Sequence, residues 1–466
     1  MRQTLLLLVT SLAITRVPAQ ITFHSLTEVW AAALKDNPTQ QVYRLKTGQL
    51  TAEYRAAESY LYPQVGGAFT GQDNLKLTVT PVPGELINQP GKTLYLSFSK
   101  HYVYNAGINA TENIFNWQSV LQSNIAHENI ALNSLQQQAY EQNLKASSAG
   151  YYFSALIAAA SLRVADQDLR LADSILATIR GRYTQGLVDL AAVHSAEINV
   201  NNVQLDRIQS SQLYQQAVQN LKILTGCTAR QSLTLSEQLA IDSPSDDTAA
   251  AMPATTSPLP AATTPGATSL IPAAPNPGPN LFPGPDRNLD VYSANTRLAQ
   301  LQTKLAKAAS YPTLSLSGFV GSQQFRDDFG LTFGDKAWND YRYLQLSLNV
   351  PIFTGFYTRN KYRSAQALAR VNAEQYRAAV EQGKINDSLL ITTYDNYRLL
   401  AAASGRNLLL YRENVELSRQ KFEEGLVSVD TWQRTFEDYL HAENTHLNNL
   451  SLMYSAMSSI ISRNPN

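Results

Sequence analysis

The residues best suited to chemistry are His441, Glu443 and His446, which lie close together near the end of the chain. Their spacing differs from that of the His-Glu-x-x-His zinc motif, so we expect no metal site there. The sequence has no glycine-rich phosphate loop and no Gly-x-Ser-x-Gly turn to hold a nucleophilic serine. Its one cysteine, Cys227, excludes an intramolecular disulfide, a zinc finger and an iron–sulfur cluster. The sequence therefore predicts a protein that is not an enzyme and uses no cofactor.

Composition narrows the class of partner. The 466 residues include 37 Lys and Arg and 37 Asp and Glu, so the formal net charge is zero. A chain without an excess of Lys and Arg cannot neutralise many phosphates of a nucleic acid, which argues against nucleic-acid binding. Charged residues make up 16% of the chain, below the roughly 25% of an ordinary soluble domain.

Residues 1–19 have the parts of a secretory signal peptide. Arg2 gives a positive start, an apolar stretch covers 5–14, and the small residue Ala19 ends a plausible cleavage site. Gln20 stands where a cysteine would suggest a lipid anchor. The alternative, an N-terminal helix of the mature protein, is too short to span a bilayer. We expect an exported protein, which would have to cross a membrane as a β-barrel because no later apolar run is long enough for a transmembrane helix.

The rest of the sequence consists of two similar repeats separated by a linker. Residues 241–287 hold 11 of the 20 prolines and a single aromatic residue, so they predict a disordered or extended linker. It separates a first repeat, 20–240, from a second repeat, 288–466. Each repeat opens with a helix-forming stretch, about 26–61 and about 289–310, that ends before Tyr-Pro.

Two alternating runs follow in each repeat. In the second repeat, Leu, Val and Ile alternate with other residues over 313–320 and again over 343–352, which is typical of half-exposed strands. In the first repeat we expect the second strand at 94–99. We expect these paired runs to end at Gly107 and Gly355.

A heptad pattern predicts long helices beyond each glycine. Apolar positions spaced 3-4-3-4 run from Leu162 to Tyr183 and, at a constant offset of 239, from Ala401 to Phe422. Each stripe reaches a Gly-Leu-Val turn and then resumes, so we expect two antiparallel helical hairpins. A single long helix with a tolerated glycine is the alternative.

Two strands per repeat give four, and a four-stranded sheet in lipid would leave both edges unpaired. The barrel must then be shared between chains, eight strands for two copies or twelve for three. Aromatic residues at strand ends and loops are placed as interfacial girdle residues would be: Tyr102, Tyr104, Phe333, Trp338 and Tyr341. A soluble antiparallel sheet is the alternative.

The chain resembles the TolC-like outer membrane efflux protein family over the whole mature sequence outside the linker. The resemblance rests on the duplication and on short motifs in a fixed order: Asn37-Pro38, Tyr-Pro before each first strand, Leu224-Thr225-Gly226, the Gly-Leu-Val turns, and Pro351-Ile352-Phe353-Thr354-Gly355. Residues 104–107 look like a degraded copy of the last of these motifs. It implies a mainly α membrane protein in which a long α-helical coiled-coil barrel continues a transmembrane β-barrel shared between three chains. It also implies an outer membrane location extending into the periplasm.

The resemblance further implies a passive exit duct of a tripartite efflux or type I secretion system. The partners would be two further copies of the chain, outer membrane lipid, a periplasmic membrane-fusion adaptor and an inner-membrane pump. The adaptor would dock at the hairpin tips, formed by Gly186, Leu187, Val188, Gly425, Leu426 and Val427, although these residues also serve to close the turns. On this plan Glu443 and His446 are polar positions at a helix interface or facing the tunnel.

The family's acidic ring is not matched here, because Ala192 and Thr431 occupy the positions six residues after the two tip glycines. Arg182, Asp189 and Asp430 are our candidates for the periplasmic constriction, and solvated tip charges are the alternative. The competing function is an exported, soluble periplasmic coiled-coil scaffold or adaptor without a pore.

Overall fold

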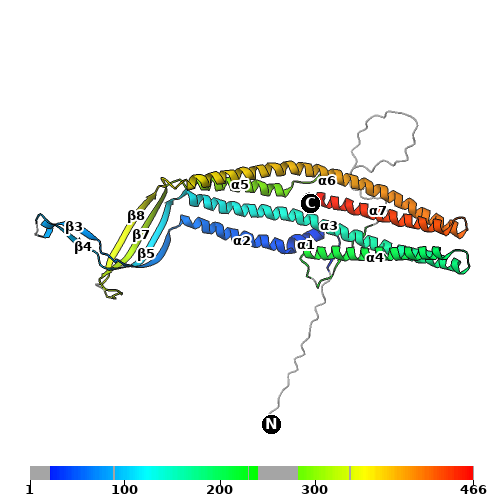
Figure 1. The fold of residues 1–466 in the computed structure, drawn as a ribbon, viewed down its shortest axis with the longest axis horizontal. Helices are drawn as coiled ribbons and strands as arrows, with labels where there is room; N and C mark the ends of the chain where they lie inside the picture. Colours follow the sequence, from blue (N-terminus) through cyan, green and yellow to red (C-terminus); the bar gives the residue numbers. More distant parts are fainter. Residues whose placement is uncertain (1–20, 88–89, 229, 240–281, 335–336, 465–466) are drawn as a thin grey trace, which may run out of the picture. The chain divides into compact units, whose positions relative to one another are not determined.

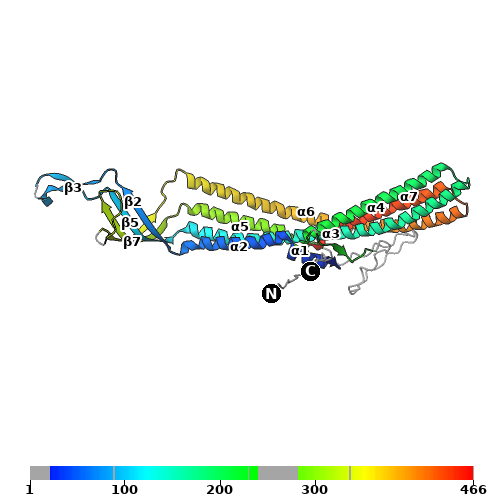
Figure 2. The same ribbon diagram turned by 90° about the horizontal axis from the view of Figure 1, so that it is seen from below.

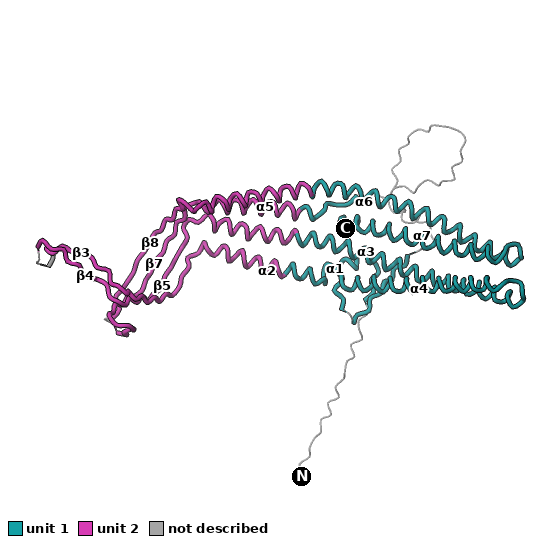
Figure 3. Tube along the Cα trace, viewed as in Figure 1, with its two compact units in different colours: residues 1–44, 136–289, 379–466 teal, residues 45–135, 290–378 magenta. Residues whose placement is uncertain are grey.

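The computed structural model describes residues 21–87, 90–228, 230–239, 282–334 and 337–464. The predicted signal peptide and most of the predicted linker lie outside the described residues. The chain divides into two compact units (Figure 3). Unit 1 comprises Met1–Arg44, Gln136–Leu289 and Ala379–Asn466, and unit 2 comprises Leu45–Leu135 and Asp290–Ala378. Each unit therefore contains segments of both predicted repeats.

Groups of helices and groups of strands follow one another along the chain (Figure 1). The helices are α1 (Leu26–Asp36), α2 (Pro38–Glu58), α3 (Trp117–Thr184), α4 (Leu190–Leu224), α5 (Arg287–Ala308), α6 (Tyr357–Glu423) and α7 (Val429–Ile461). The strands are β1 (Ile21–Phe23), β2 (Gln64–Asp73), β3 (Val79–Pro83), β4 (Thr93–Ser97), β5 (Tyr102–Phe115), β6 (Leu233–Leu235), β7 (Thr313–Arg326) and β8 (Asn339–Asn349). Among the described helices, none carries an apolar stretch of the length needed to cross a bilayer.

In unit 1, α3 with α4 and α6 with α7 form two antiparallel hairpins that lie side by side (Figures 1 and 2). The heptad positions pack between them: Ile179 is fully buried, and Phe422 and Phe436 are 2% and 1% exposed. Tyr183 and Tyr411 depart from the pattern, because they are 43% and 38% exposed. The prediction of two helical hairpins is confirmed.

Two of the family-like motifs meet in unit 1. The break between α1 and α2 falls at Asn37, whose side-chain amide donates to the carbonyl of Leu224 at 2.9 Å and accepts the hydroxyl of Tyr140 at 3.0 Å. Gly226 turns the chain with φ 69°, and a Cβ there would lie 2.3 Å from the carbonyl oxygen of Asp36. Asn37 and Gly226 therefore fix the end of α4 against the α1–α2 junction.

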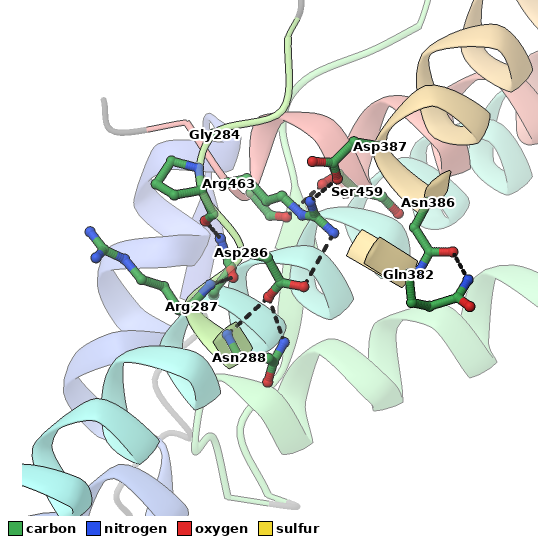
Figure 4. Close-up of polar contacts among 12 residues, drawn as sticks. Gly284, Asp286, Arg287, Asn288, Gln382, Asn386, Asp387, Ser459 and Arg463 are labelled. Carbon is green, nitrogen blue, oxygen red and sulfur yellow. Dashed lines mark hydrogen bonds and ion pairs between the residues drawn. The ribbon is translucent and has the colours of Figure 1, made fainter. Parts of the chain in front are cut away.

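The last residues of the predicted linker are not disordered: α5 begins at Arg287, and the residues just before it are held by the end of the chain (Figure 4). The guanidinium of Arg463 pairs with Asp387 of α6 and lies 3.8 Å from a carboxylate oxygen of Asp286. The backbone N–H of Gly284 donates to the side-chain oxygen of Asn464 at 3.0 Å. The carbonyl of Pro285 accepts from Gln142 of α3 at 2.9 Å. These polar contacts anchor residues 284–287 within unit 1.

Unit 2 contains a four-stranded antiparallel sheet with the order β2-β5-β7-β8 (Figures 1 and 2). Two strands come from each repeat, as predicted. The prediction of a strand at 94–99 in this sheet is wrong, because β4 pairs with β3 in a separate hairpin inserted between β2 and β5. The first repeat's second sheet strand is β5, so Gly107 lies in the middle of a strand and residues 104–107 do not match the element that precedes Gly355.

The two faces of this sheet differ in polarity. Residues paired across antiparallel strands point to the same face, so the register assigns each side chain to one of them. One face is apolar and exposed, with Val65, Phe69, Ile108, Val320, Leu344, Leu346 and Leu348 between 58% and 76% exposed. The other face carries mainly hydroxyl and amide side chains, including Thr70, Asn105, Asn109, Thr111, Ser315, Ser317, Gln345 and Ser347.

Two glycines face each other on the central strands. Gly107 of β5 faces Gly321 of β7, and the ring of Phe319 covers them from the polar face. A Cβ on Gly321 would lie 2.3 Å from the carbonyl oxygen of Ala106, which is backbone and cannot turn aside. Phe319 is 7% exposed and stacks on Tyr343, so it fills the space that the two missing side chains leave.

Two of the predicted girdle residues make contacts within unit 2. Tyr104 is 7% exposed, because Phe69 stacks against its ring and its hydroxyl accepts from the N–H of Gly330. Tyr341 contacts Phe319 and Tyr343, so it belongs to the polar face rather than to the apolar one. Phe333, in contrast, is 85% exposed.

Candidate functional site at the hairpin tips

Both hairpin turns are built in the same way and lie at the same end of unit 1 (Figure 1). Gly186 and Gly425 adopt φ 74° and 76°, in the left-handed region that glycine enters without steric cost. The N–H of Leu187 reaches back to the carbonyl of Arg182 at 3.0 Å, which closes the last turn of α3, and the second tip repeats this bond. A Cβ on either glycine would meet nothing within 4 Å, so the backbone conformation and not crowding requires glycine.

The helices that leave the turns are capped by side chains. The carboxylate of Asp189 accepts the N–H of Ala192 at 2.9 Å and so caps α4. Ser428 does the same for α7, accepting the N–H of Thr431 at 3.2 Å. Asp430 lies exposed in the first turn of α7, where the positive end of the helix dipole favours a carboxylate.

The apolar residues of the tips separate into two kinds. Leu187 and Leu426 are 67% and 69% exposed, although leucine is usually buried. Val188 and Val427 are half-buried and pack against the core between the hairpins. The valines therefore close the turns, and the two leucines form the exposed apolar surface of the tips.

Near the tips the two hairpins are joined by polar contacts. The guanidinium of Arg182 donates to the carbonyl of Phe422 at 3.0 Å and lies 3.9 Å above its ring. On the other side, the side-chain amide of Gln433 donates to the carbonyl of Ala192 at 2.9 Å. The ring of Phe422 in turn stacks on Trp432 at 4.8 Å. Arg182 is thus engaged between the hairpins, whereas Asp430 is exposed.

Further along the hairpins, a buried carboxyl pair links α3 to α7. Asp168 and Glu443 are 5% and 6% exposed, and the hydroxyl of Tyr439 bonds to both, at 3.3 Å and 3.1 Å. Burial, together with the hydrogen bond and the charge of Asp168, raises the pKa of Glu443 to about 9. Burial also raises the pKa of Asp168. A cavity of about 20 Å³, room for a single water, adjoins both carboxyls.

The sequence as a whole matches one protein family. The sequence profile of the outer membrane efflux proteins matches residues 29–227 and 285–461. The chain belongs to this family. Its members are proteins of the outer membrane, so the efflux protein described here is one as well. No curated protein sequence matches it significantly.

Solved structures share the fold of this efflux protein at low identity. The outer membrane channel CmeC of Campylobacter jejuni is 15% identical with a TM-score of 0.69, covering 94% of this chain and 85% of that one. VceC of Vibrio cholerae is 17% identical with a TM-score of 0.68, covering 94% and 95%. The open state of the MtrE channel of Neisseria gonorrhoeae is 16% identical with a TM-score of 0.70, covering 94% and 88%.

The polar residues predicted near the C-terminus of the efflux protein have separate environments. His446 is buried between α6 and α7, where its Nδ1 lies 3.0 Å from the hydroxyl of Ser404, and burial lowers its pKa. Glu443 faces α3 instead, so the prediction of helix-interface positions is confirmed for both. In the part of the chain that the structure describes, no group of three or more His, Cys, Asp or Glu side chains is arranged to hold a metal ion.

Sequence reasoning missed Asp168 as the partner of Glu443. The two residues are far apart in sequence, and only the packing of one hairpin on the other brings them together. The available signal was an acidic residue directly before Leu169 within the heptad stripe. Among the residues predicted for the constriction, Arg182 and Asp189 have other contacts.

Proposed function

We propose that three copies of this efflux protein close one β-barrel in the outer membrane and that the duct continues through a periplasmic helical tunnel. The sheet of unit 2 carries the argument. Within the described residues, β2 and β8 each pair with only one strand of this sheet, so both edges present free backbone groups. Lipid cannot satisfy such groups, whereas β8 of one copy can pair with β2 of the next. Three four-stranded sheets would give a twelve-stranded barrel.

The polarity of the sheet supports this arrangement. The exposed apolar face suits the acyl chains of the membrane, and the hydroxyl and amide face suits a water-filled lumen. The sheet strands have 10, 14, 14 and 11 residues, sufficient for the roughly 9–11 that a tilted membrane strand needs. Relatives with the same fold are described as outer membrane channels.

The helices supply the length that a duct needs. The 68 residues of α3 extend roughly 100 Å at 1.5 Å per residue, far more than a globular core requires. We expect no energy-converting site in this chain, so transport would be driven by an inner-membrane pump that connects through a periplasmic adaptor. The family assignment favours this passive exit duct over the soluble scaffold.

The proposal is tested by fractionation followed by the native mass in detergent. We expect a heat-sensitive species in the outer membrane with a mass near three times that of the mature chain. Insertion of that species into a planar bilayer should produce discrete current steps. A soluble periplasmic monomer, or a trimer that inserts without current even after Asp189 and Asp430 are neutralised, would contradict the duct.

The exposed leucines lead to a prediction about docking. Replacing Leu187 and Leu426 together by aspartate should reduce export at least about tenfold, because two charges would enter a small apolar contact worth a few kcal/mol. Export of a pump substrate from cells measures the loss, and the detergent mass shows that trimers persist. Tryptophan at Gly186 and Gly425 should have the same effect through bulk and backbone strain. Unchanged export in both double variants would remove the tips from adaptor docking.

The exposed acid of α7 leads to a prediction about the constriction. Three copies of Asp430 around the symmetry axis would attract divalent cations, as carboxylate rings do in cation-selective pores. Asp430→Asn should therefore weaken the block of bilayer current by millimolar divalent cations. Asp189→Asn should do so less and should also loosen α4, since Asp189 caps that helix. If the Asp430→Asn channel is blocked as strongly as the parent, Asp430 is a solvated surface charge.

A further inference from the structure

The junction between β8 and α6 forms a groove against the last turns of α5, all within unit 2. Its volume is about 390 Å³. Its lining includes the apolar residues Ile352, Phe353 and Phe356, the cations Lys307 and Arg359, and several smaller or polar residues. Among the described residues, no Asp or Glu lines it. A groove lined by three large apolar residues and an excess of positive charge suits an amphipathic anion.

The apolar residues of the groove continue the apolar face of the sheet. Leu344, Leu346 and Leu348 point to that face, and the alternation leads on to Ile352, which is 94% exposed. Phe353 and Phe356 follow at 74% and 59% exposed, with their rings edge to face at 5.5 Å. An acyl chain lying on the sheet would therefore reach the groove without crossing a polar surface.

The backbone of the junction is strained in a way that sets these rings. Phe356 has φ 65°, and it is the one non-glycine residue with a positive φ among those the structure describes. A bulky side chain is disfavoured in this region, because its Cβ crowds the neighbouring carbonyl oxygen. In this conformation the ring of Phe356 lies next to Phe353 and is exposed. Exposure of an apolar ring to water does not offset the energetic cost of the backbone conformation. Such strain is typical of positions that serve a ligand.

The two cations of the groove, Lys307 and Arg359, are free to bind an anionic ligand. In the described part of the chain, neither Lys307 nor Arg359 has an ion pair or a side-chain hydrogen bond, and both are exposed. The hydroxyls of Thr354 and Thr358 bond to each other at 2.9 Å, which leaves one hydroxyl hydrogen to donate. Arginine, lysine and hydroxyl groups are the usual ligands of a phosphate.

We propose that this groove binds an anionic phospholipid, with the phosphate between Lys307 and Arg359 and an acyl chain along Ile352 and the sheet. The inference rests on the proposed function, because it requires the apolar face of the sheet to lie in the membrane. A phospholipid satisfies the apolar residues and the cations of the groove at once, whereas a free phosphate would leave Ile352, Phe353 and Phe356 in water. The other possible occupant, a neighbouring copy of the chain, would leave the cations without a partner unless it supplied an acid.

The test measures bound lipid on the assembled protein. Delipidated trimer in detergent is incubated with equal amounts of phosphatidylglycerol and phosphatidylethanolamine, and the bound lipids are counted by native mass spectrometry. We expect the parent to retain phosphatidylglycerol at least about fivefold over phosphatidylethanolamine. Lys307→Gln with Arg359→Gln should bring the ratio close to one. Lys304→Gln with Arg370→Gln removes the same charge from exposed positions of α5 and α6 outside the groove and should keep the parent ratio.

Each of the following outcomes would overturn the inference. The groove variant keeps the parent preference, or inorganic phosphate displaces the lipid at equal concentration, or cysteine at Ile352 cross-links one copy to the next in lipid-loaded trimers. A trimer that conducts but shows no lipid preference overturns the lipid site alone. A chain recovered as a soluble monomer overturns the proposed function, and the lipid site with it.

Discussion

Replacing Gly321 by alanine should prevent assembly of the membrane form of this efflux protein. The new Cβ would lie 2.3 Å from the carbonyl oxygen of Ala106 and 2.6 Å from the Cα of Gly107. Both neighbours are backbone of the paired strand, so relief requires β5 and β7 to separate and their hydrogen bonds to stretch. Overpacking of a well-packed site costs about 1–3 kcal/mol, and three copies in one barrel would multiply it. Loss of the heat-sensitive oligomer on gels measures the effect.

Gly318→Ala provides a matched control on the same strand. A Cβ there would lie 3.6 Å from both the side chain of Leu344 and the carbonyl of Tyr343, which is ordinary contact. This variant should assemble like the parent. Phe319→Ala should assemble poorly because packing is lost rather than crowded: without the ring, the backbone of Gly107 and Gly321 is uncovered. Normal oligomer yield from Gly321→Ala would show that the two strands can separate without loss of assembly.

Glu443→Gln should remove a pH dependence from the stability of the helical hairpins. The pKa of Glu443 is raised from 4.5 to about 9 in the folded protein. Between these values the unfolded chain has lost its proton while the folded chain keeps one, so the free energy of unfolding falls as pH rises. One such group contributes up to about 1.4 kcal/mol per pH unit. The thermal midpoint of helical circular dichroism at pH 7 and pH 8.5 measures the slope.

The glutamine is neutral at every pH and retains hydrogen-bonding atoms for Tyr439 and Asp168, so its midpoint should change less over this interval. Arg412 and Asp206 also act on the pair and are present in both proteins. His446 has a lowered pKa and affects stability only as pH falls below its ordinary value of 6.5, outside the interval. Glu437→Gln, an exposed change on the same helix, should keep the parent slope. An equal slope in Glu443→Gln would show that the pair ionises freely.

The helical part of the fold was predictable because its signals are local and repeated. Positions such as Ile179 and Phe422 recur at heptad spacing, and Gly186 and Gly425 mark the turns. The first repeat's sheet was harder for a physical reason. The run around Leu94 alternates and is a strand, but it pairs locally in the β3–β4 hairpin. The sheet strand of the first repeat, β5, contains three asparagines and a glycine among its 14 residues and has a weaker alternation.

The contents of the candidate site were predictable only in part. The tip residues follow from the turns, yet nothing local separates Leu187, which is exposed, from Val188, which packs inward. Arg182 carries a charge at the tip, but its role depends on Phe422 of the other hairpin. Docking and constriction at these residues stay predictions. Contacts between distant segments depend on how the hairpins pack. No local spacing of residues in a single sequence predicts such contacts.

The anchoring of the chain on both sides of residues 240–281 has a practical consequence for experiments. On one side, Arg163 of α3 donates to the carbonyl of Leu239 at 2.8 Å, and on the other, Asn464 and Gln142 hold Gly284 and Pro285. Both attachment points, Leu239 and Gly284 with Pro285, therefore lie within unit 1. A tag fused directly after Asn464 would disturb this anchoring, because Arg463 and Asn464 hold the residues that precede α5.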